Sequence, residues 1–461
     1  MNTTPSMMDY VLERYAARSP LSLMARIGLE HCFSNATLDR LFERHRSQGY
    51  TQTLTFSATV DLMTLVVTGA QPSVRAAYPH RNVGVRLKSV YEKLQHLEPA
   101  VCEAMVAETS ARAAALLTEM KAERAPWLPG LRLKILDGNH LAATERRIEA
   151  VRGSHAGPLP GFVIAVYEPT TELVRRVLLC EDGHTQERAL LADVLPLVEP
   201  SDCWVGDRNF CTSGFLLGIA ERQGTFLMRQ HGGLELQAVG ARVACGRVET
   251  GEVFEQEVML GTGVRARRVR RITVRLNTPT RDGDQELHLL SNVPREVASA
   301  TALAEAYRVR WRIEVAFNRL AMWLNAELAP LGYPKAALFG FCVGLLAYNL
   351  VATLLGALRA AHGAEKIDAD VSGYLIVQDV RMNEPGLDVI LDAAEWTARY
   401  RRRTVAEVAS ELLMLARRVD LRRIPKAKTR PKNPAKPRTR FKGQPHVSTA
   451  RLLNEQRKSR S

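Results

Sequence analysis

Three acidic residues have the types and the spacing that metal-assisted phosphodiester chemistry requires. Asp137 follows the alternating run 131–136, Asp207 follows the short apolar run 203–206, and Glu314 lies in a segment with helical spacing. Two carboxylates at the ends of neighbouring strands and a third on a packed helix can hold two hard cations about 4 Å apart. Such a pair activates a water or a sugar hydroxyl for in-line attack and stabilises the oxygen that leaves.

The segment 307–320, which carries Glu314, is predicted to be one amphipathic helix. It holds no Gly or Pro, and its apolar residues recur with the period of a helix. Tyr307 and Arg310 share a face with Glu314, next to the apolar stripe. A third stripe is expected to face away from the core and contains Arg308, Arg312 and Arg319. For this segment alone, an ordinary amphipathic helix with solvated arginines is the alternative.

The elements around the first two acids are expected in the order β-β-β-α-β-α-β. The patterns predict strands at 131–136, 161–167, 173–179, 203–206 and 225–228, and helices at 187–195 and 212–222. In this order the acids 137 and 207 follow the first and the fourth strand. The sequence therefore predicts an α/β core in which both acids lie at one edge of the sheet.

At these residues the chain resembles the insertion-sequence-four family of DDE transposases. The similarity rests on Asp137-Gly138 after a strand, on Asp207-x-Asn209-Phe210, and on Tyr307-x2-Arg310-x3-Glu314. It covers about 131–350 well and the flanks more loosely. The resemblance implies a ribonuclease-H-like catalytic core and cut-and-paste movement of the DNA element that encodes the protein.

The resemblance also assigns roles to residues and implies partners. Asp137, Asp207 and Glu314 would be the catalytic metal ligands for two Mg²⁺ ions, with Mn²⁺ able to substitute. Tyr307 and Arg310 would contact DNA phosphate near the cleaved bond. A homodimer would synapse two element ends, and the double-stranded DNA partners would be the terminal inverted repeats and the target.

The sequence departs from that family at two places. The family motif has a lysine seven residues after the glutamate, where this chain has Ala321. The β-rich region 230–290 contains no tryptophan, which in some relatives holds a flipped base. Whether a hairpin intermediate forms therefore stays open.

Positive charge is concentrated at the C-terminus, which points to a polyanion partner. Residues 422–460 hold fourteen Lys and Arg and one acid, so they account for +13 of the formal charge of +14. A second cluster is predicted to bind DNA along an exposed strand and contains Arg265, Arg267, Arg268, Arg270 and Arg271. The alternatives are a solvated edge strand for this cluster and a solubilising tail for the C-terminus.

The fold class expected is α/β, a ribonuclease-H-like core interrupted by a β-rich insertion, with helical N-terminal and C-terminal regions. The predicted parts are a helical domain that could bind DNA (1–125), the first part of the core (131–229), the insertion (230–290), the second part of the core (291–360), a helical region (361–425) and a basic disordered tail (426–461).

Three further features bear on compartment and membrane association. The seven scattered cysteines form no CxxC pair, which favours a reducing compartment, and the N-terminus lacks a signal-peptide pattern. Together with the family resemblance and the basic tail, this leads us to expect a bacterial cytoplasmic, nucleoid-associated protein. The uncharged run 336–358 is long enough to cross a bilayer, but it is interpreted as a buried core helix and no membrane partner is expected. His140 is either a metal ligand or a polar residue of a turn.

Three function classes are compatible with these patterns. The first is a DDE transposase that cuts element ends and joins them to target DNA. The second is a ribonuclease-H-like nuclease that cuts without joining. The third is an inactive DNA-binding derivative, against which the three intact acids count.

Overall fold

The structure is a computed structural model that describes residues 7–48, 53–81, 83–141, 157–280, 283–326, 331–390, 393–427 and 446–460. The α-helices are α1 (Met7–Arg18), α2 (Pro20–Phe33), α3 (Asn35–His45), α4 (Phe56–Val67), α5 (Val74–Ala77), α6 (Leu87–His96), α7 (Pro99–Glu119), α9 (Leu191–Val194), α10 (Ser213–Glu221), α11 (Ala300–Arg308), α12 (Trp311–Trp323), α13 (Pro334–His362), α14 (Ala364–Asp370), α15 (Gly373–Ile390), α16 (Ala393–Tyr400), α17 (Val405–Arg417) and α18 (Thr449–Arg460). The strands are β1 (Arg132–His140), β2 (Gly157–Leu159), β3 (Phe162–Glu168), β4 (Leu173–Cys180), β5 (Asp202–Gly206), β6 (Thr225–Arg229), β7 (Leu236–Ala238), β8 (Val243–Val248), β9 (Gly251–Leu260), β10 (Arg267–Leu276), β11 (Glu286–Ser291) and β12 (His446–Ser448).

The centre of the molecule is a mixed sheet whose first five strands lie in the order β4-β3-β1-β5-β6. β4, β3 and β1 are antiparallel to one another, whereas β5 and β6 run parallel to β1. This order and these directions are those of ribonuclease-H-like domains, so the predicted fold class is confirmed. The five predicted strands all form because each has apolar residues on both faces, as a sheet covered by helices on two sides requires.

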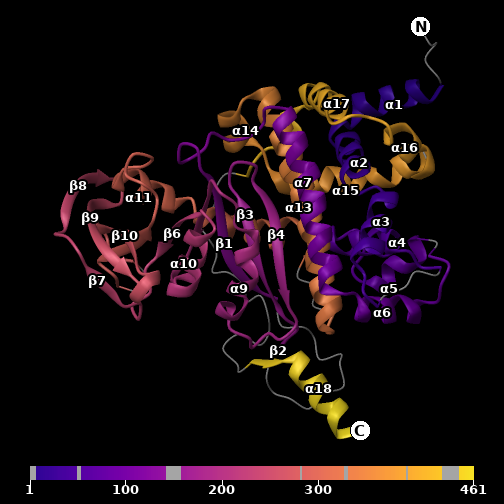
Figure 1. Ribbon diagram of the computed structural model, residues 1–461. Coiled ribbons are helices and arrows are strands. Elements are labelled where there is room, and N and C mark those ends of the chain that lie inside the picture. Colours follow the sequence, from indigo (N-terminus) through magenta and orange to yellow (C-terminus); the bar gives the residue numbers. More distant parts are fainter. Residues whose placement is uncertain are drawn as a thin grey trace.

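The insertion extends the same sheet instead of forming a separate layer. β11 pairs antiparallel with β6, β10 with β11, β9 with β10, and β7 and β8 both pair with β9. Figure 1 shows these strands as a curved continuation of the core sheet, with α11 packed on one face. The arginine-rich strand β10 therefore lies between two strands, and the alternative of a solvated edge strand is wrong.

The helices of the two ends of the chain pack on each other beside the sheet (Figure 1). α7 lies along β4, α13 packs against α7, and α2 contacts both α15 and α17. The helical N-terminal and C-terminal regions are therefore neighbours in space. The sheet is held between these helices on one face and α9 and α10 on the other, and each face has its own apolar core.

One helix, α13, is long and apolar enough to cross a membrane, and it is the only one among the described residues. In its most apolar window 94% of the residues are buried by the rest of the protein. The polar Asn349 on this helix bonds the backbone of β4, accepting from Val174 N and donating to Val174 O, each at 2.9 Å. The structure thus agrees with a core helix whose polar groups have partners.

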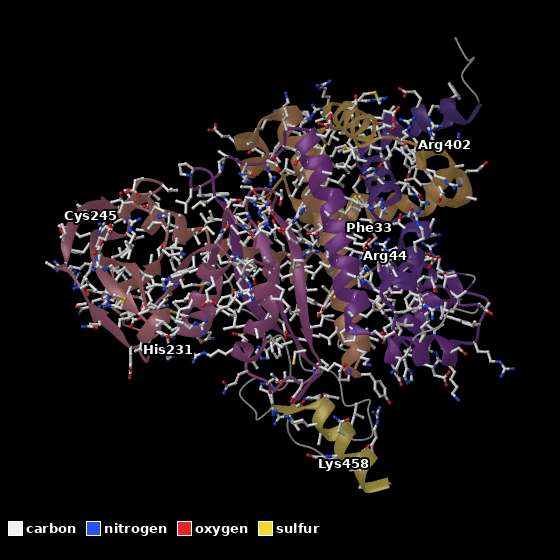
Figure 2. All side chains as sticks on the ribbon, in the orientation of Figure 1. Phe33, Arg44, His231, Cys245, Arg402 and Lys458 are labelled. Carbon is white, nitrogen blue, oxygen red and sulfur yellow. The ribbon has the colours of Figure 1, made fainter. Side chains whose placement is uncertain are left out.

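The end of the C-terminal segment is folded, which differs from the disordered tail that its composition predicts. β12 pairs parallel with β2, Ser448 is fully buried, and Arg451 lies 2.7 Å from Asp182 across an ion pair. Figure 2 places Lys458 on α18, below the core sheet. The Pro/Lys/Arg-rich stretch 428–445 lies outside the described residues.

The segment 307–320 is helical but not one helix. α11 ends at Arg308 and α12 begins at Trp311. At the junction Val309 N bonds Ala306 O, and Arg310 N bonds Tyr307 O, so each amide bonds the carbonyl three residues earlier. This tighter turn rotates the chain by about 120° per residue instead of about 100°. The sequence contains no Gly or Pro to signal it.

Candidate active site

The register of β1 against β5 brings Asp137 and Asp207 side by side. The last parallel pair of these strands is Ile135 with Val205, and each aspartate follows two residues later. Neighbouring strands lie about 4.8 Å apart, so the carboxylates leave the sheet at the same place. Asp137 was predicted to end its strand, but it lies within β1, because β1 continues to His140 along β3. The site lies where β1 and β5 part.

Glu314 reaches the same place from the first turn of α12, through an arginine. The Arg310 guanidinium makes an ion pair with Glu314, and its Nη1 lies 3.6 Å from Asp137 Oδ2. The three side chains are 17–29% exposed, so a ligand from solvent can reach them. The structure therefore places Asp137 next to Asp207 and connects Glu314 to Asp137 only through Arg310, which lies between these two acids.

The turn after β5 is built to hold Asp207. Asp207 caps the 3₁₀ helix Arg208–Phe210, and its Oδ1 accepts from Asn209 N at 2.8 Å. Phe210 is fully buried and anchors the turn in the core. Arg188 donates from Nε to Asn209 O at 2.9 Å, from the segment before β5. The Asp-x-Asn-Phe pattern thus sets the direction of one carboxylate.

Tyr307 lies beside the acids but is buried. It lies in the last turn of α11, is 8% exposed, and has its pKa raised by burial and by the charge of Asp207, against the opposing effect of Arg310. The phenol therefore stays protonated. Direct contact with DNA phosphate, which the resemblance implies, is not open to this side chain in the present conformation.

The donor set fits a divalent cation in its chemistry. All three groups are carboxylates, the ligands that Mg²⁺ and Mn²⁺ prefer. Burial raises the pKa of Asp137 to about 7, opposed by Arg310 and assisted by the charges of Asp207 and Glu314. The three acids and Arg310 together carry a net negative charge when all four are ionised, as a cation site demands.

The spacing of the donors is looser than that of a closed metal site. No three His, Cys, Asp or Glu side chains in the described part of the chain stand close enough together to hold an ion. Because Arg310 lies between Asp137 and Glu314, a cation shared by these two acids requires the guanidinium to turn aside.

His140 occupies a packing position rather than a place among the acids. It is the last residue of β1, and its ring stacks on Phe162 with the centroids 5.1 Å apart. Burial lowers its pKa, and the nearby His446 and His184 lower it further. Within the described ranges no carboxylate pairs with His140, so the structure favours the structural interpretation.

The predicted DNA-contacting arginines separate into two groups. Arg265, Arg267 and Arg268 are exposed, although Arg265 pairs with Glu221 at 2.8 Å. Arg270 is 7% exposed and forms a two-pronged ion pair with Glu255, at 3.0 and 2.9 Å. The DNA contact predicted for Arg270 is therefore wrong in this conformation: strand alternation turns its side chain toward α11, where it also bonds two carbonyls.

Arg271, the fifth arginine of that cluster, points to the opposite face of β10 from Arg270. Its side chain is half-buried, and burial lowers its pKa, with the charge of Arg242 lowering it further. A guanidinium that is only partly accessible can reach a phosphate less readily than its exposed neighbours. Arg271 is therefore a weaker candidate for DNA contact than Arg268.

A buried cluster of charged residues behind α12 was not predicted from the sequence. Glu172, 4% exposed, pairs with Arg124 at 3.0 Å, with Arg312 at 3.2 Å and with Arg359. Burial alone would raise the pKa of Glu172, but these arginines, Arg359 foremost, hold it below its usual value. Arg312 was expected in solvent; instead it fastens the helix of Glu314 to the turn between β3 and β4.

An apolar cavity of about 380 Å³ lies elsewhere, in the helical region. Its lining comes from α2, α4, α13 and α15 and includes Phe33, Val60 and Leu350. None of the predicted site residues borders it. The chemistry of the chain thus belongs to the open sheet edge with its acids, which suits a long polymeric substrate better than an enclosed pocket.

Residues 129–350 match the family model of the transposase DDE domain, which spans the sheet, the insertion and the helix of Glu314. No curated protein sequence matches the chain. A solved structure of the piggyBac transposase synaptic complex with hairpin DNA superposes with a TM-score of 0.41, at 7% identity over 85% of each chain. That likeness is too distant to inform the site.

The matched region contains every element that positions the three acids, and enzymes with this domain use divalent metal ions. Enzymes with this domain act on DNA, and the exposed arginines of the insertion could bind its phosphates. Residues 129–350 thus form a transposase DDE domain, and the protein is an enzyme that cleaves DNA and transfers its strands, a DNA transposase.

Proposed function

We propose that Asp137, Asp207 and Glu314 are the catalytic metal ligands of this transposase and that they hold two Mg²⁺ ions, with Mn²⁺ able to substitute. The observation that carries the proposal is the β1–β5 register, which brings two carboxylates together where the strands part. Glu314 is linked to the same place through Arg310. When bound, the cations lower the pKa of the attacking water or hydroxyl and stabilise the leaving oxygen.

The protein side chains have distinct tasks in this scheme. Asn209 and the buried Phe210 fix the direction of Asp207. Arg310, one turn before Glu314, neutralises the acids without a cation and is placed to meet a DNA phosphate when it turns outward. The ion pair between Arg312 of α12 and Glu172 holds this helix against the sheet, and the helix positions Glu314.

The motif residues support a finer identity. Asp137-Gly138, Asp207-x-Asn209-Phe210 and the Tyr-Arg-Glu spacing support an insertion-sequence-four transposase that moves its element by cut and paste. Such an enzyme acts on the terminal inverted repeats and on target DNA, as a homodimer that synapses two ends. The basic C-terminal segment supports a place at the bacterial nucleoid, in the cytoplasm.

The test is cleavage of a DNA fragment that carries one element end, with Mg²⁺ or Mn²⁺. The variants Asp137→Asn, Asp207→Asn and Glu314→Gln should each lose cleavage by at least about a thousandfold, because a group essential to the reaction is removed. Binding of the same fragment in a gel-shift assay should remain. Glu305→Gln, an exposed acid on α11 paired with Arg308, is the matched control. Wild-type cleavage by any of the three variants would remove that residue from the catalytic set.

The homodimer is tested separately by sedimentation velocity of the protein with one end and with two ends. Two protein copies on two ends are expected. A single copy that completes strand transfer would contradict the synaptic dimer while leaving the catalytic proposal intact.

A further inference from the structure

The C-terminal arm, residues 446–460, is folded onto the end of the core sheet near which the acids lie. Its strand β12 pairs with β2, and β2 leads into β3. The first residue of β3, Phe162, pairs with Cys180 at the end of β4 and with His140 at the end of β1. Figure 1 shows α18 beyond this end of the sheet. The arm is therefore attached beside the end of β1, three residues after Asp137.

The arm is held in one place by buried contacts and an ion pair. β2 packs so closely on the turn after β4 that a Cβ on Gly183 would stand 2.6 Å from Leu159 Cβ. Ser448 lies opposite Leu159 in the strand pair and is fully buried. In the first turn of α18, Arg451 donates from Nε to Asp182 Oδ2 at 2.7 Å. These contacts fix the start of α18 relative to the sheet.

Beyond its first turn, α18 has little apolar surface that could hold it. Leu452 and Leu453 are half-buried, whereas the side chains at 454, 455 and 457–459 are exposed. A helix of twelve residues is marginal in water by itself, and one with so narrow an apolar stripe gains little from packing. We therefore expect a partner to stabilise this helix.

The charge of α18 selects a polyanion as that partner. The helix carries a net charge of +3, from one acid, Glu455, and four bases: Arg451, Arg457, Lys458 and Arg460. Arg457 forms no ion pair with any residue that the structure describes, and Figure 2 places Lys458 on the projecting part of the helix. Duplex DNA presents one negative charge per about 1.7 Å of its axis. A second copy of this chain, with a formal charge of +14, complements the helix less well.

The place of the arm determines which phosphates it reaches. Extended chain spans at most about 3.6 Å per residue and paired strands lie about 4.8 Å apart, so the attachment at β2 is within about 30 Å of Asp137. From there α18 extends by about 18 Å, at 1.5 Å per residue. One turn of duplex DNA is about 34 Å long. DNA whose cleaved bond lies at the acids therefore meets the arm about one turn away.

We propose that the C-terminal arm is a DNA clamp, in which α18 binds backbone phosphates about one duplex turn from the cleaved bond. The clamp fixes the direction in which the DNA leaves the acids, which a disordered basic tail does not do. The distance to the cleaved bond rests on the proposed catalytic acids, whereas the contact between α18 and DNA does not.

The experiment measures binding of the full-length protein, without a divalent cation, to duplexes that carry one element end. In each duplex one phosphate is replaced by a neutral methylphosphonate. Replacement about one turn from the element terminus should weaken binding by the wild type. The double variant Arg457→Gln with Lys458→Gln should show a salt slope of log affinity lower by about 1.8. It should also be insensitive to these replacements, because both changes remove the same contact.

Two further variants separate the position of the arm from its charge. Asp182→Ala keeps every base of α18 and removes the partner of Arg451, so the position-specific loss of binding should disappear. Arg401→Gln with Arg402→Gln removes two exposed charges from the helical region, where Figure 2 shows Arg402 far from α18. This control should keep the wild-type slope and the wild-type response to each replacement. Equal melting temperatures of all variants would exclude misfolding.

The clamp would be overturned by a wild-type response to the replacements in the Arg457→Gln, Lys458→Gln variant. Weaker binding by that variant without any position-specific change, or an equal loss of slope in the control, would also overturn it. If the same variant dissociated a protein dimer in sedimentation velocity and bound DNA normally, α18 would be an interface with a second copy. Failure of the catalytic proposal is distinguishable, because Asp137→Asn would then still cleave while the response to the replacements persisted.

Discussion

Replacing Arg270 by alanine should destabilise the protein and leave DNA binding unchanged. The guanidinium makes two bonds to Glu255 and donates to Val293 O at 2.9 Å and to Ala298 O at 2.7 Å. Both members of the ion pair are 7% exposed. Removing one partner of a buried pair typically costs about 3–5 kcal/mol, and Glu255 would keep only the more exposed Arg295, at 2.7 Å.

The effect should be readily measured by thermal unfolding. About 2–4 °C per kcal/mol is usual for a domain of 150–250 residues, so the melting temperature should fall by about 6–20 °C. The double variant Arg270→Met with Glu255→Met should recover a part of that loss, since removing both charges leaves no buried ion. Arg295, which also contacts Glu255, is 55% exposed and can remain in solvent.

Arg268→Ala is the matched control on the same strand. Its side chain is exposed, so the melting temperature should stay within about 1 °C of the wild type while the salt dependence of DNA binding weakens. Each phosphate contact contributes about 0.9 to the slope of log affinity against log salt. A lower slope with an unchanged melting temperature in Arg270→Ala would refute the assignment of Arg270 to the core.

Three further predictions concern the acids, the tail and the α12 helix. Without a cation, the pKa of Asp137 is about 7 against 3.8 in the unfolded chain, so this group contributes stability below pH 4 that is lost as pH rises through 7. In EDTA the free energy of unfolding of Asp137→Asn should therefore exceed that of the wild type increasingly toward pH 8, by at most about 4 kcal/mol. A difference that does not change with pH would contradict the shift. Truncation after residue 427 should reduce the salt slope of binding to all DNA sequences by about 0.9 per lost contact, and an unchanged slope would assign the tail no phosphate contact. Ala321→Lys places a positive charge on the exposed face of α12, seven residues after Glu314. It should tighten the binding of element ends and raise the yield of joined product. No gain in either measurement would show that another group already contacts the DNA phosphate there.

The core could be predicted because its signals are local. Apolar runs such as 203–206 and 225–228 specify buried strands by composition, and the residue that follows a strand is at the sheet edge by construction. Asp207 follows β5, and Asp137 lies within β1, two residues after the last β1–β5 pair, so the two acids meet as soon as the order of strands is known. The third acid was placed by its helix, whose spacing with Arg310 survives in the observed ion pair.

The wrong predictions concern side chains whose burial depends on a partner far away in the sequence. On β10, arginines occupy both faces, so the sequence of that strand gives no sign of which face is buried. Only the pairing of Ile272 with Glu255 brings a carboxylate within reach of Arg270. Arg312 likewise finds Glu172, 140 residues earlier, and Glu187 lies over Gly138 from a different segment. From its charge alone, an arginine side chain is predicted to lie in solvent. An acidic residue far away in the sequence can pair with it and hold it in the core instead.

The position of Arg310 couples the binding of cations to the binding of DNA. Without a cation its guanidinium neutralises Glu314 and lies 3.6 Å from Asp137, so it is withheld from phosphate. Cation binding at these acids must release it, and released it adds a charge-assisted contact with DNA. Binding linkage is reciprocal, so Mn²⁺ should tighten DNA binding by the factor by which DNA tightens Mn²⁺ binding. In Arg310→Ala both factors should shrink together. Mutual enhancement of wild-type size in that variant would show that Arg310 does not connect the two events.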